Sequence, residues 1–314
     1  MFDVVCYNKL IFITGAGLLI INHYNMQTKT ILLVALFSLM QFCNSLFAQT
    51  NGWYSSKEVG PKTWVIKEPG YDENMYLLEG QDSSLLIDAG FGAANLRDFV
   101  KSLTSKPLII INTHFHPDHT GGDYQFPFVF IGAKDLDYAK PFLNREVVQQ
   151  INRQVLHDTT ITDSLKFPGS QVQKTTLIPV DDNYVFKLGD RNVQVINVPG
   201  HTPGSIFLLD SKNKVLYSGD NMQTTWLFSK ESLSVGAYLR SLEKLNRIKG
   251  RYNVLYPGHG DPVEVSVLDE LKQCCEQILS GKCKAEPYHS ITGEDAVSCT
   301  YKTVTIAYDI AKVN

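Results

Sequence analysis

The residues that point most directly to chemistry are three histidines and one aspartate in a single hexapeptide. They occur in the segment His114-Phe115-His116-Pro117-Asp118-His119. Protonated imidazoles this close together would repel one another, whereas neutral imidazole is a preferred ligand of zinc and similar divalent ions. The hexapeptide therefore predicts a metal site.

The local backbone decides how these side chains are presented. Residues two apart in an extended segment share a face, so we expect His114 and His116 to point the same way. Pro117 disfavours a helical backbone at His116, and Asp118 and His119 then fall in the first turn of a following helix. One short turn can therefore present two pairs of ligands to two adjacent ions.

Three further candidate ligands share one kind of location, the point where an expected strand gives way to a loop. They are His201 in Pro199-Gly200-His201-Thr202-Pro203-Gly204, Asp220 after Tyr217-Ser218-Gly219, and His259 after Tyr256-Pro257-Gly258. Rigid scaffolds commonly hold functional groups at such positions. Together with the hexapeptide, these three residues are predicted to join the same site.

The elements that must position these residues are short strands alternating with helices. We expect strands at 63–66, 75–78, 85–87, 108–111, 184–186, 193–196, 206–209, 215–217, 254–256 and 303–306. Helices are expected at about 93–103, 134–156 with a break near Pro141, 235–248 and 263–279. Residues 49–314 contain no internal linker or repeat, so they are predicted to form a single mixed α/β domain. The helical insertion from Asp135 to His157 is a candidate lid.

In type and order, these residues resemble the metallo-β-lactamase-fold hydrolase superfamily. Its pattern is His-x-His-x-Asp-His, followed by His, then Asp, then His, and the resemblance runs from the strand before Asp88 to His259. It implies a four-layer αβ/βα sandwich with two mixed β-sheets and metals at the edge between the sheets. By matching position, the implied ligands are His114, His116 and His201 for one metal, Asp118, His119 and His259 for a second, and Asp220 as a bridge. Asp88 matches a supporting carboxylate behind the hexapeptide, or is a turn residue at a strand end.

The chemistry that the resemblance implies is hydrolysis. The expected cofactors are two zinc ions, with iron or manganese as alternatives. Two divalent ions about 3.5–4 Å apart can share a water and lower its pKa toward about 7, which yields a hydroxide nucleophile at neutral pH. Asp118 is the expected catalytic residue, because it can accept a hydrogen bond from that water and orient it.

The residue at position 220 reduces the number of candidate reactions. Antibiotic-hydrolysing members of the family usually have Cys or Ser where this chain has Asp220, which disfavours β-lactam hydrolysis and leaves it as an alternative. The favoured function is an exported dinuclear zinc hydrolase that cleaves an ester, thioester, lactone or amide bond of a small molecule. A persulfide dioxygenase with one iron is a second alternative, and a non-catalytic zinc-binding protein a third. The loop Thr224-Thr225-Trp226-Leu227-Phe228 either contacts the substrate or packs in the core.

Composition excludes one class of partner. The chain of 314 residues is 44% hydrophobic and 19% charged, and its formal net charge is −3. Nucleic-acid-binding domains usually carry a basic balance or patch, and none is present in this sequence. A small-molecule substrate is therefore expected rather than a nucleic acid. The sequence does not indicate an oligomeric state.

The first 48 residues read as a leader. Lys29 precedes the apolar run Ile31–Phe37, and a cleavage-like site ends at Ala48, which is the layout of a secretory signal peptide over residues 26–48. Met26 is a candidate true start, so residues 1–25 are read as a mis-assigned start or as part of a double-hydrophobic anchor. The residues before Cys43 do not favour a lipoprotein. We expect a periplasmic or secreted protein that does not span a membrane after the signal is removed.

Four cysteines remain after the leader: Cys274, Cys275, Cys283 and Cys299. Their spacing does not match a zinc knuckle. The sequence predicts one bridge to Cys299, from either Cys283 or the helix that carries Cys274 and Cys275, and it does not choose between them.

Overall fold

The computed structural model of the chain describes residues 10–14, 17–21, 49–50, 52–69, 72–155, 174–290 and 293–314. The chain divides into two compact units, Met1–Phe47 and Ala48–Asn314. In the first unit, β1 (Leu10–Thr14) and β2 (Gly17–Ile21) pair as an antiparallel hairpin. The signal peptide predicted over 26–48, with Cys43, lies outside the described residues. No helix among the described residues is long and apolar enough to cross a membrane.

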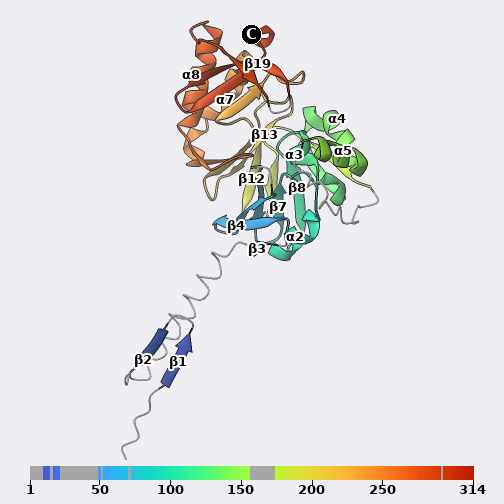
Figure 1. Cartoon of the computed structure of the whole chain (residues 1–314), viewed down its shortest axis with the longest axis vertical. Helices are drawn as coiled ribbons and strands as arrows, with labels where there is room; N and C mark the ends of the chain where they lie inside the picture. The colour runs from blue at the N-terminus through green and yellow to red at the C-terminus, as the bar shows by residue number, and fades with distance from the viewer. Residues whose placement is uncertain are drawn as a thin grey trace, which may run out of the picture. The chain divides into compact units, whose positions relative to one another are not determined.

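Two large sheets form the centre of the second unit (Figure 1). The first sheet has the strand order β10-β9-β8-β7-β6-β5-β4-β3 and is parallel from β7 to β10. Its strands are β3 (Gln49–Thr50), β4 (Ser55–Gly60), β5 (Thr63–Lys67), β6 (Met75–Glu79), β7 (Ser84–Ile87), β8 (Leu108–Asn112), β9 (Phe128–Gly132) and β10 (Thr176–Val180). The second sheet has the order β11-β12-β13-β14-β16-β17. Its strands are β11 (Val185–Lys187), β12 (Asn192–Asn197), β13 (Ile206–Asp210), β14 (Val215–Gly219), β16 (Val254–Pro257) and β17 (Val263–Glu264).

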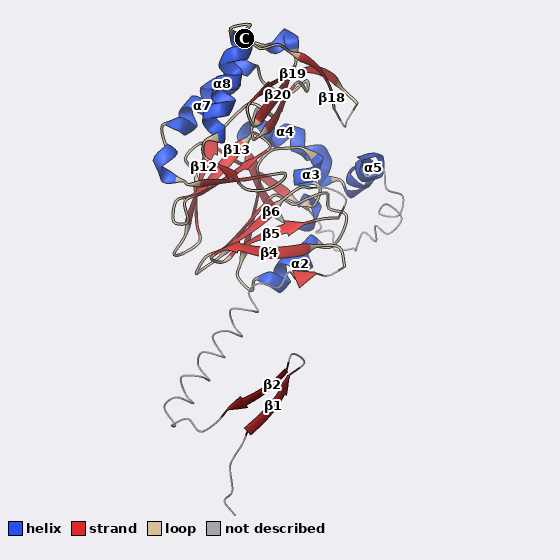
Figure 2. Ribbon diagram, turned by 60° about the vertical axis from the view of Figure 1, so that its left-hand side comes forward, coloured by secondary structure: helices blue, strands red, loops and turns tan. Residues whose placement is uncertain are grey.

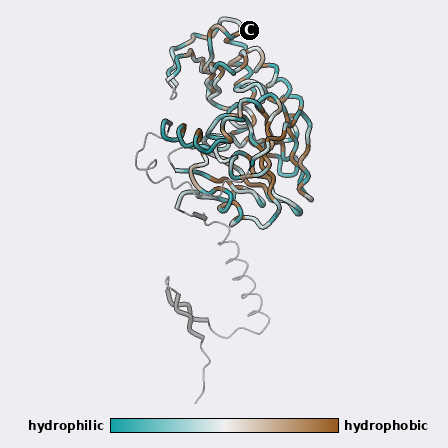
Figure 3. Tube along the Cα trace, turned by 90° about the vertical axis from the view of Figure 1, so that its right-hand side faces the viewer, coloured by the Kyte–Doolittle hydropathy of each residue, from teal (hydrophilic) through white to brown (hydrophobic). Residues whose placement is uncertain are grey.

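The central strands are buried on both faces, because each sheet packs on the other sheet and on helices. Successive side chains of a strand point to opposite faces. In β6, Leu78 faces the core between the two sheets, whereas Leu77 faces the core shared with α2 (Leu96–Leu103). In β13, Leu208 faces the core between the sheets, and Leu209 faces the core shared with the helices 235–246 and 267–279. The strands therefore read as continuous apolar runs, and hydrophobic residues gather on them in Figure 3.

Helices α7 (Val235–Asn246) and α8 (Val267–Leu279) lie side by side against the second sheet (Figure 2). The layers therefore run α, β, β, α, which confirms the sandwich predicted from the sequence. One further helix, α5 (Arg145–Val155), has 11 residues. The remaining helical segments are short: α3 (Pro117–Thr120), η1 (Asp123–Gln125), η2 (Ala133–Asp135), α4 (Leu136–Ala139), η3 (Lys140–Leu143), η4 (Lys249–Arg251) and η5 (Ile310–Lys312). The expected break near Pro141 falls in η3.

A third sheet was not anticipated from the sequence. It has the order β15-β20-β19-β18 and consists of β15 (Thr224–Leu227), β20 (Val304–Tyr308), β19 (Asp295–Tyr301) and β18 (Glu286–His289). The disulfide Cys283–Cys299 joins the segment before β18 to β19. This is one of the pairings that the sequence left open. Cys274 and Cys275 are buried and are not disulfide-bonded.

One end of the sandwich is closed by a buried arginine. The guanidinium of Arg191 donates to Asp210 Oδ2 in the second sheet, at 2.8 Å from Nε, and to Thr63 Oγ1 in the first sheet, at 2.9 Å. Because Arg191 precedes β12 and His201 follows it, this clamp lies at the end of β12 away from the candidate ligand. The clamp holds the two sheets together at the end opposite to the site.

Candidate metal centre

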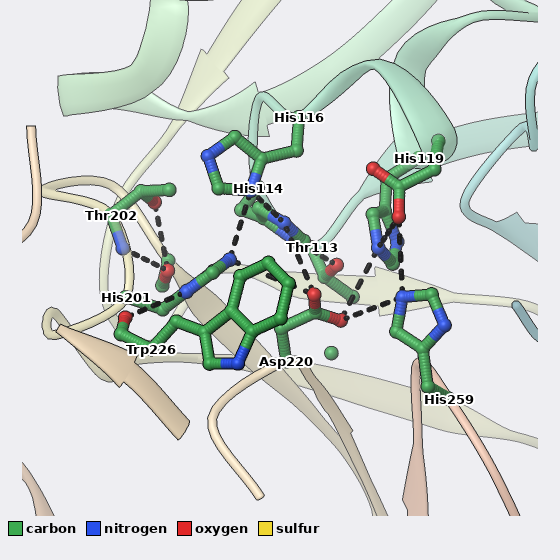
Figure 4. A network of polar contacts seen from close by, with 12 residues as sticks. Thr113, His114, His116, His119, His201, Thr202, Asp220, Trp226 and His259 are labelled. Atoms are coloured by element: carbon green, nitrogen blue, oxygen red, sulfur yellow. Dashed lines mark hydrogen bonds and ion pairs between the residues drawn. The ribbon is translucent and has the colours of Figure 1, made fainter. Parts of the chain in front are cut away.

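All seven residues predicted as ligands converge at one edge of the two large sheets. His114, His116, Asp118 and His119 follow β8, His201 follows β12, Asp220 follows β14 and His259 follows β16. The local expectation for the hexapeptide is confirmed: His116 is extended, with φ −61° and ψ 150°, and Pro117 begins the short helix α3. Figure 4 shows the imidazoles of His114, His119, His201 and His259 pointing toward the carboxylate of Asp220. The imidazole of His116 lies against those of His114 and His201.

The seven side chains form two groups that share Asp220. The first group contains His114, His116, His201 and Asp220, and the second contains Asp118, His119, Asp220 and His259. Within each group the candidate ligand atoms lie within 4.8 Å of one another. Asp220 contributes a different oxygen to each group: Oδ2 lies 3.6 Å from His201 Nε2, and Oδ1 lies 3.2 Å from His119 Nε2. This carboxylate is therefore placed as a bridge between two sites.

The separations of the ligand atoms suit tetrahedral metal coordination. Two atoms bound at about 2.0–2.2 Å to one tetrahedral zinc lie about 3.3–3.6 Å apart. In the second group, His259 Nε2 lies 3.2 Å from Asp118 Oδ2 and 3.5 Å from Asp220 Oδ1. In the first group, His116 Nδ1 lies 3.1 Å from His114 Nε2 and 2.9 Å from His201 Nε2. Both groups are thus close to the spacing that an ion of this size requires.

Hydrogen bonds on the far side of three imidazoles fix which nitrogen faces the centre. His201 Nδ1 lies 2.9 Å from the carbonyl oxygen of Trp226, and His119 Nδ1 lies 2.9 Å from Asp88 Oδ2. Both partners only accept, so each Nδ1 carries the proton and each Nε2 presents a lone pair to the centre. Such partners orient the ligands of metal sites and set their basicity.

Asp88 arranges the third imidazole through Thr113. Its Oδ2 accepts from the Thr113 hydroxyl at 3.0 Å, and its Oδ1 accepts from the Thr113 backbone N–H at 2.7 Å. Because the hydroxyl donates to Asp88, its oxygen is left to accept from His114 Nδ1, 3.1 Å away. A single buried carboxylate thus orients His114 and His119, which belong to different groups.

The fit of a cation to the centre is clearest at two buried atoms. His119 Nε2 and Asp220 Oδ1 are buried and have no hydrogen-bond partner among the described residues, although they lie 3.2 Å apart. A lone pair and a carboxylate oxygen facing each other in a buried space are unfavourable unless a cation or a proton lies between them. The donor set of imidazoles and carboxylates is one that zinc and related divalent ions accept.

Charge differs between the two groups. Burial lowers the pKa of His116 to about 3, and the neighbouring His201 adds to this, so the imidazole is neutral and able to act as a ligand. Burial alone would also lower the pKa of His119, but Asp118 and Asp220 outweigh it and hold that pKa well above its ordinary value. The carboxylates of the second group therefore favour positive charge at the place where its ligand atoms meet.

Sequence reasoning missed Asp135, which ties two ligand-bearing loops together. This buried residue follows β9, and its Oδ2 accepts from the backbone N–H of Phe115 at 3.1 Å and from the Thr202 hydroxyl at 2.6 Å. Its Oδ1 accepts from the backbone N–H of Gly204 at 2.6 Å. Burial raises the pKa of Asp135 to about 6. The Asp-Leu-Asp segment around it looks like an ordinary polar helix start, so the sequence offers no local signal for this role.

Further supports lie around His259. Asn74 donates from Nδ2 to the carbonyl oxygens of Pro257 and Gly260, and the Tyr76 hydroxyl donates to Pro257 at 2.8 Å. Gly258 leaves no room for a side chain: a Cβ at this position would lie 2.6 Å from Asp220 Oδ1 and 2.9 Å from a carbon of the His119 ring. The glycine is therefore required for the close approach of its backbone to the centre.

A cavity of about 480 Å³ opens beside the centre. This volume lies in the range of small-molecule sites. Its wall includes five of the candidate ligands, His116, Asp118, His201, Asp220 and His259. It also includes the apolar side chains of Phe91, Met222, Trp226, Phe228, Pro257 and Tyr288. Part of the loop 224–228 thus lines the cavity, which is one of the two roles expected for it.

Other predicted features lie away from the cavity. None of the described residues 135–155 of the candidate lid lines it. His157 lies outside the described residues. His289 is exposed at the surface and pairs with Asp295.

Comparison with known proteins identifies the family. Residues 69–259 match the family described as the metallo-beta-lactamase superfamily, so the chain belongs to this superfamily and is a hydrolase of the metal-dependent class. It is 30% identical over 230 residues to the acyl-coenzyme A thioesterase MBLAC2 of Homo sapiens, a match that covers 66% of this chain and 81% of that protein. It is 27% identical over 199 residues to the atrochrysone carboxyl ACP thioesterase of Emericella nidulans, covering 62% and 53% of the two chains.

Solved structures agree on the fold. The metallo-beta-lactamase from Erythrobacter litoralis superposes with a TM-score of 0.53 at 14% identity, covering 74% of this chain and 100% of that one. At this identity the likeness shows the fold alone. The fold class predicted from the sequence is confirmed.

Proposed function

We propose that this protein is a dinuclear metal-dependent hydrolase that cleaves the thioester bond of a small acyl compound. The observation that carries the proposal is the division of Asp220 between two groups of ligand atoms, Oδ2 in one and Oδ1 in the other. The choice of a thioester among ester, thioester, lactone and amide bonds is supported by the two thioesterases to which the chain is similar.

The residues that would hold the first ion are His114, His116 and His201, and those for the second are Asp118, His119 and His259, with Asp220 shared. We propose zinc as the metal, because the donor set suits it. When bound, the ions would lower the pKa of a water molecule so that hydroxide forms at neutral pH, and would polarise the bond that is cleaved.

Asp118 is the proposed catalytic residue. Burial would raise its pKa, but His119 and His259 outweigh this effect and hold the pKa well below its ordinary range. The side chain is therefore a carboxylate at physiological pH, and it lines the cavity. It can accept a hydrogen bond from the attacking water and orient that water toward the acyl carbon. The apolar side chains that line the cavity would hold the substrate and exclude bulk water from the reacting bond.

The proposal is tested by metal analysis followed by a panel of substrates. The purified protein should contain two zinc ions per chain and should release thiol from acyl thioesters, detected by a thiol reagent. The variant His116→Ala should fold, as judged by circular dichroism, but should lose turnover. Full activity in this variant would show that the catalytic site does not lie at these residues.

The same two measurements separate the alternatives. A single iron per chain with consumption of oxygen would identify a sulfur dioxygenase. Turnover of β-lactams without turnover of thioesters would identify a β-lactamase.

We also propose that the protein is exported. The layout of residues 26–48 supports this location, and so does the Cys283–Cys299 disulfide, because disulfides persist in oxidising compartments and are rare in the cytosol. The proposal is tested by N-terminal sequencing of the mature protein from the cell fraction that contains it. A mature chain that keeps residues 26–48 in the cytoplasm would contradict it.

A further inference from the structure

The third sheet contributes an aromatic wall to the cavity. Trp226 and Phe228 come from β15 and the residue that follows it, and Tyr288 comes from β18, at the opposite edge of the sheet. The three rings nonetheless meet: the ring centroids lie 5.3 Å apart for Trp226 and Phe228, 5.9 Å for Phe228 and Tyr288, and 6.4 Å for Trp226 and Tyr288. We call these three residues the aromatic wall.

Strand register explains how rings from the two edges come together. Trp226 is paired with Ala307, Ala307 with Ser298, and Ser298 with Glu286, so these four side chains share one face of the sheet. Tyr288, two residues beyond Glu286, lies on the same face and opposite Ala296. The two inner strands thus carry small side chains on this face, and these leave room for large rings from the edges to reach across.

The other face of the sheet is already occupied. Leu227, Ile306 and Tyr308 are buried there against the core that contains α7 and α8. The face with the aromatic wall is the one that turns to the cavity, since Thr224, Trp226 and Phe228 alternate along the chain and all line it. Each ring of the wall is only partly buried, which leaves apolar surface available to a ligand.

The wall is fixed relative to the candidate ligands. Trp226 presents its ring to the cavity, while its backbone carbonyl accepts from His201 Nδ1 at 2.9 Å. Tyr288 is held from the other side, because Cys283, five residues earlier, is disulfide-bonded to Cys299 in the neighbouring strand β19. An apolar group lying on the wall would therefore have a set position relative to the metal centre.

We propose that the third sheet is the element that selects the substrate: the aromatic wall binds the acyl group, and Tyr288 determines a preference for apolar acyl groups longer than acetyl. This inference rests on the proposed thioesterase activity. It assigns a role in specificity to a sheet of which only β15 lies within the family match, which ends at residue 259. Aromatic and apolar side chains bind a hydrocarbon chain without requiring one particular shape. The expected preference is therefore for longer apolar acyl chains rather than for one particular acyl group.

The test compares decanoyl and acetyl thioesters of N-acetylcysteamine, an uncharged thiol, on the metal-loaded protein. In Tyr288→Ala, kcat/KM should fall about tenfold more for the decanoyl than for the acetyl substrate, because an apolar contact is lost. Tyr288→Phe keeps the ring and should restore the wild-type ratio. Phe228→Ala should also lower the ratio of kcat/KM for the decanoyl substrate to that for the acetyl substrate. This second variant keeps the test decisive if Tyr288→Ala folds poorly. The control Tyr184→Ala removes an exposed ring outside the cavity and should leave both substrates unaffected.

A binding measurement separates this inference from the proposed reaction. The non-hydrolysable thioether S-decyl-N-acetylcysteamine should bind to wild-type protein at least tenfold more tightly than its S-ethyl counterpart, as measured by calorimetry, and Tyr288→Ala should remove most of the difference. If the wild-type protein turned over no thioester but still preferred the decyl compound, the proposed function would fail while the assignment of the wall survived. Equal decanoyl-to-acetyl ratios in wild type, Tyr288→Ala and Phe228→Ala would overturn the inference.

Discussion

Replacement of Asp88 by asparagine is expected to weaken metal binding without removing any ligand. Asp88 Oδ2 accepts from His119 Nδ1 and from the Thr113 hydroxyl, and Oδ1 accepts from the Thr113 backbone N–H. An amide has one accepting oxygen and one donating NH₂ group, so one of the two carboxylate positions must become a donor. The NH₂ group facing the Thr113 N–H would leave a buried donor unsatisfied, at a cost of about 1–3 kcal/mol. The amide oxygen therefore stays at that position.

The consequence is a change of tautomer at two candidate ligands. With the NH₂ group facing His119, Nδ1 must accept, and the proton moves to Nε2, where it points between Asp118 and Asp220. The Thr113 hydroxyl loses its acceptor as well and turns to donate to His114 Nδ1, which moves the proton of His114 to Nε2. Changes to the partners of metal-bound histidines typically cost 10–100-fold in affinity. We expect a loss of about this size for each of the two ions.

The assay is competition between the zinc-loaded protein and a chromophoric chelator. Asp88 has a left-handed backbone, with φ of 63°, which asparagine also tolerates, so the substitution adds little backbone strain. The matched control is Asp123→Asn: Asp123 is also buried and accepts from Asn112, but it contacts none of the candidate ligands. A zinc affinity of Asp88→Asn within twofold of wild type, with the fold intact, would refute the reasoning.

Three further changes probe other features. Asp135→Ala leaves the buried N–H groups of Phe115 and Gly204 without their acceptor, whereas the Thr202 hydroxyl can donate to Ser205 Oγ. The substitution should lower the free energy of unfolding by about 4 kcal/mol in urea titration, at about 1–3 kcal/mol per donor; a loss below about 1 kcal/mol would contradict this. Gly258→Ala places a methyl group against Asp220 and His119 and should lower zinc affinity more than tenfold, whereas Gly250→Ala, with open space around it, should not. Cys283→Ser opens a bridge that spans 16 residues, for which the loop entropy predicts a loss of about 3 kcal/mol, measured as a lower thermal midpoint; an unchanged midpoint would show that the bridge does not stabilise the domain.

The seven candidate ligands could be selected from the sequence because their signals are local. The hexapeptide contains its own geometry, since Pro117 keeps His116 extended and begins α3. His201, Asp220 and His259 were found because each directly follows an apolar strand. A strand end and a histidine are both visible in sequence, and their order matches a known family.

Residues that act through burial were not visible in the same way. Asp135 lies in a polar segment that resembles a helix start, and its importance comes from three donors contributed by distant loops. Strand β18 reads Glu-Pro-Tyr-His and shows no apolar alternation, so the third sheet and the placement of Tyr288 went unpredicted. These features depend on long-range packing, which no window of the sequence records.

The double use of Trp226 bears on how this enzyme can be changed. Its contact with His201 is made by the main chain, and its contact with the cavity is made by the side chain. Every amino acid supplies the same carbonyl oxygen, so a library randomised at position 226 explores the shape of the cavity while retaining the hydrogen bond that orients the imidazole. Position 226 is thus a natural starting point for laboratory evolution toward new acyl compounds.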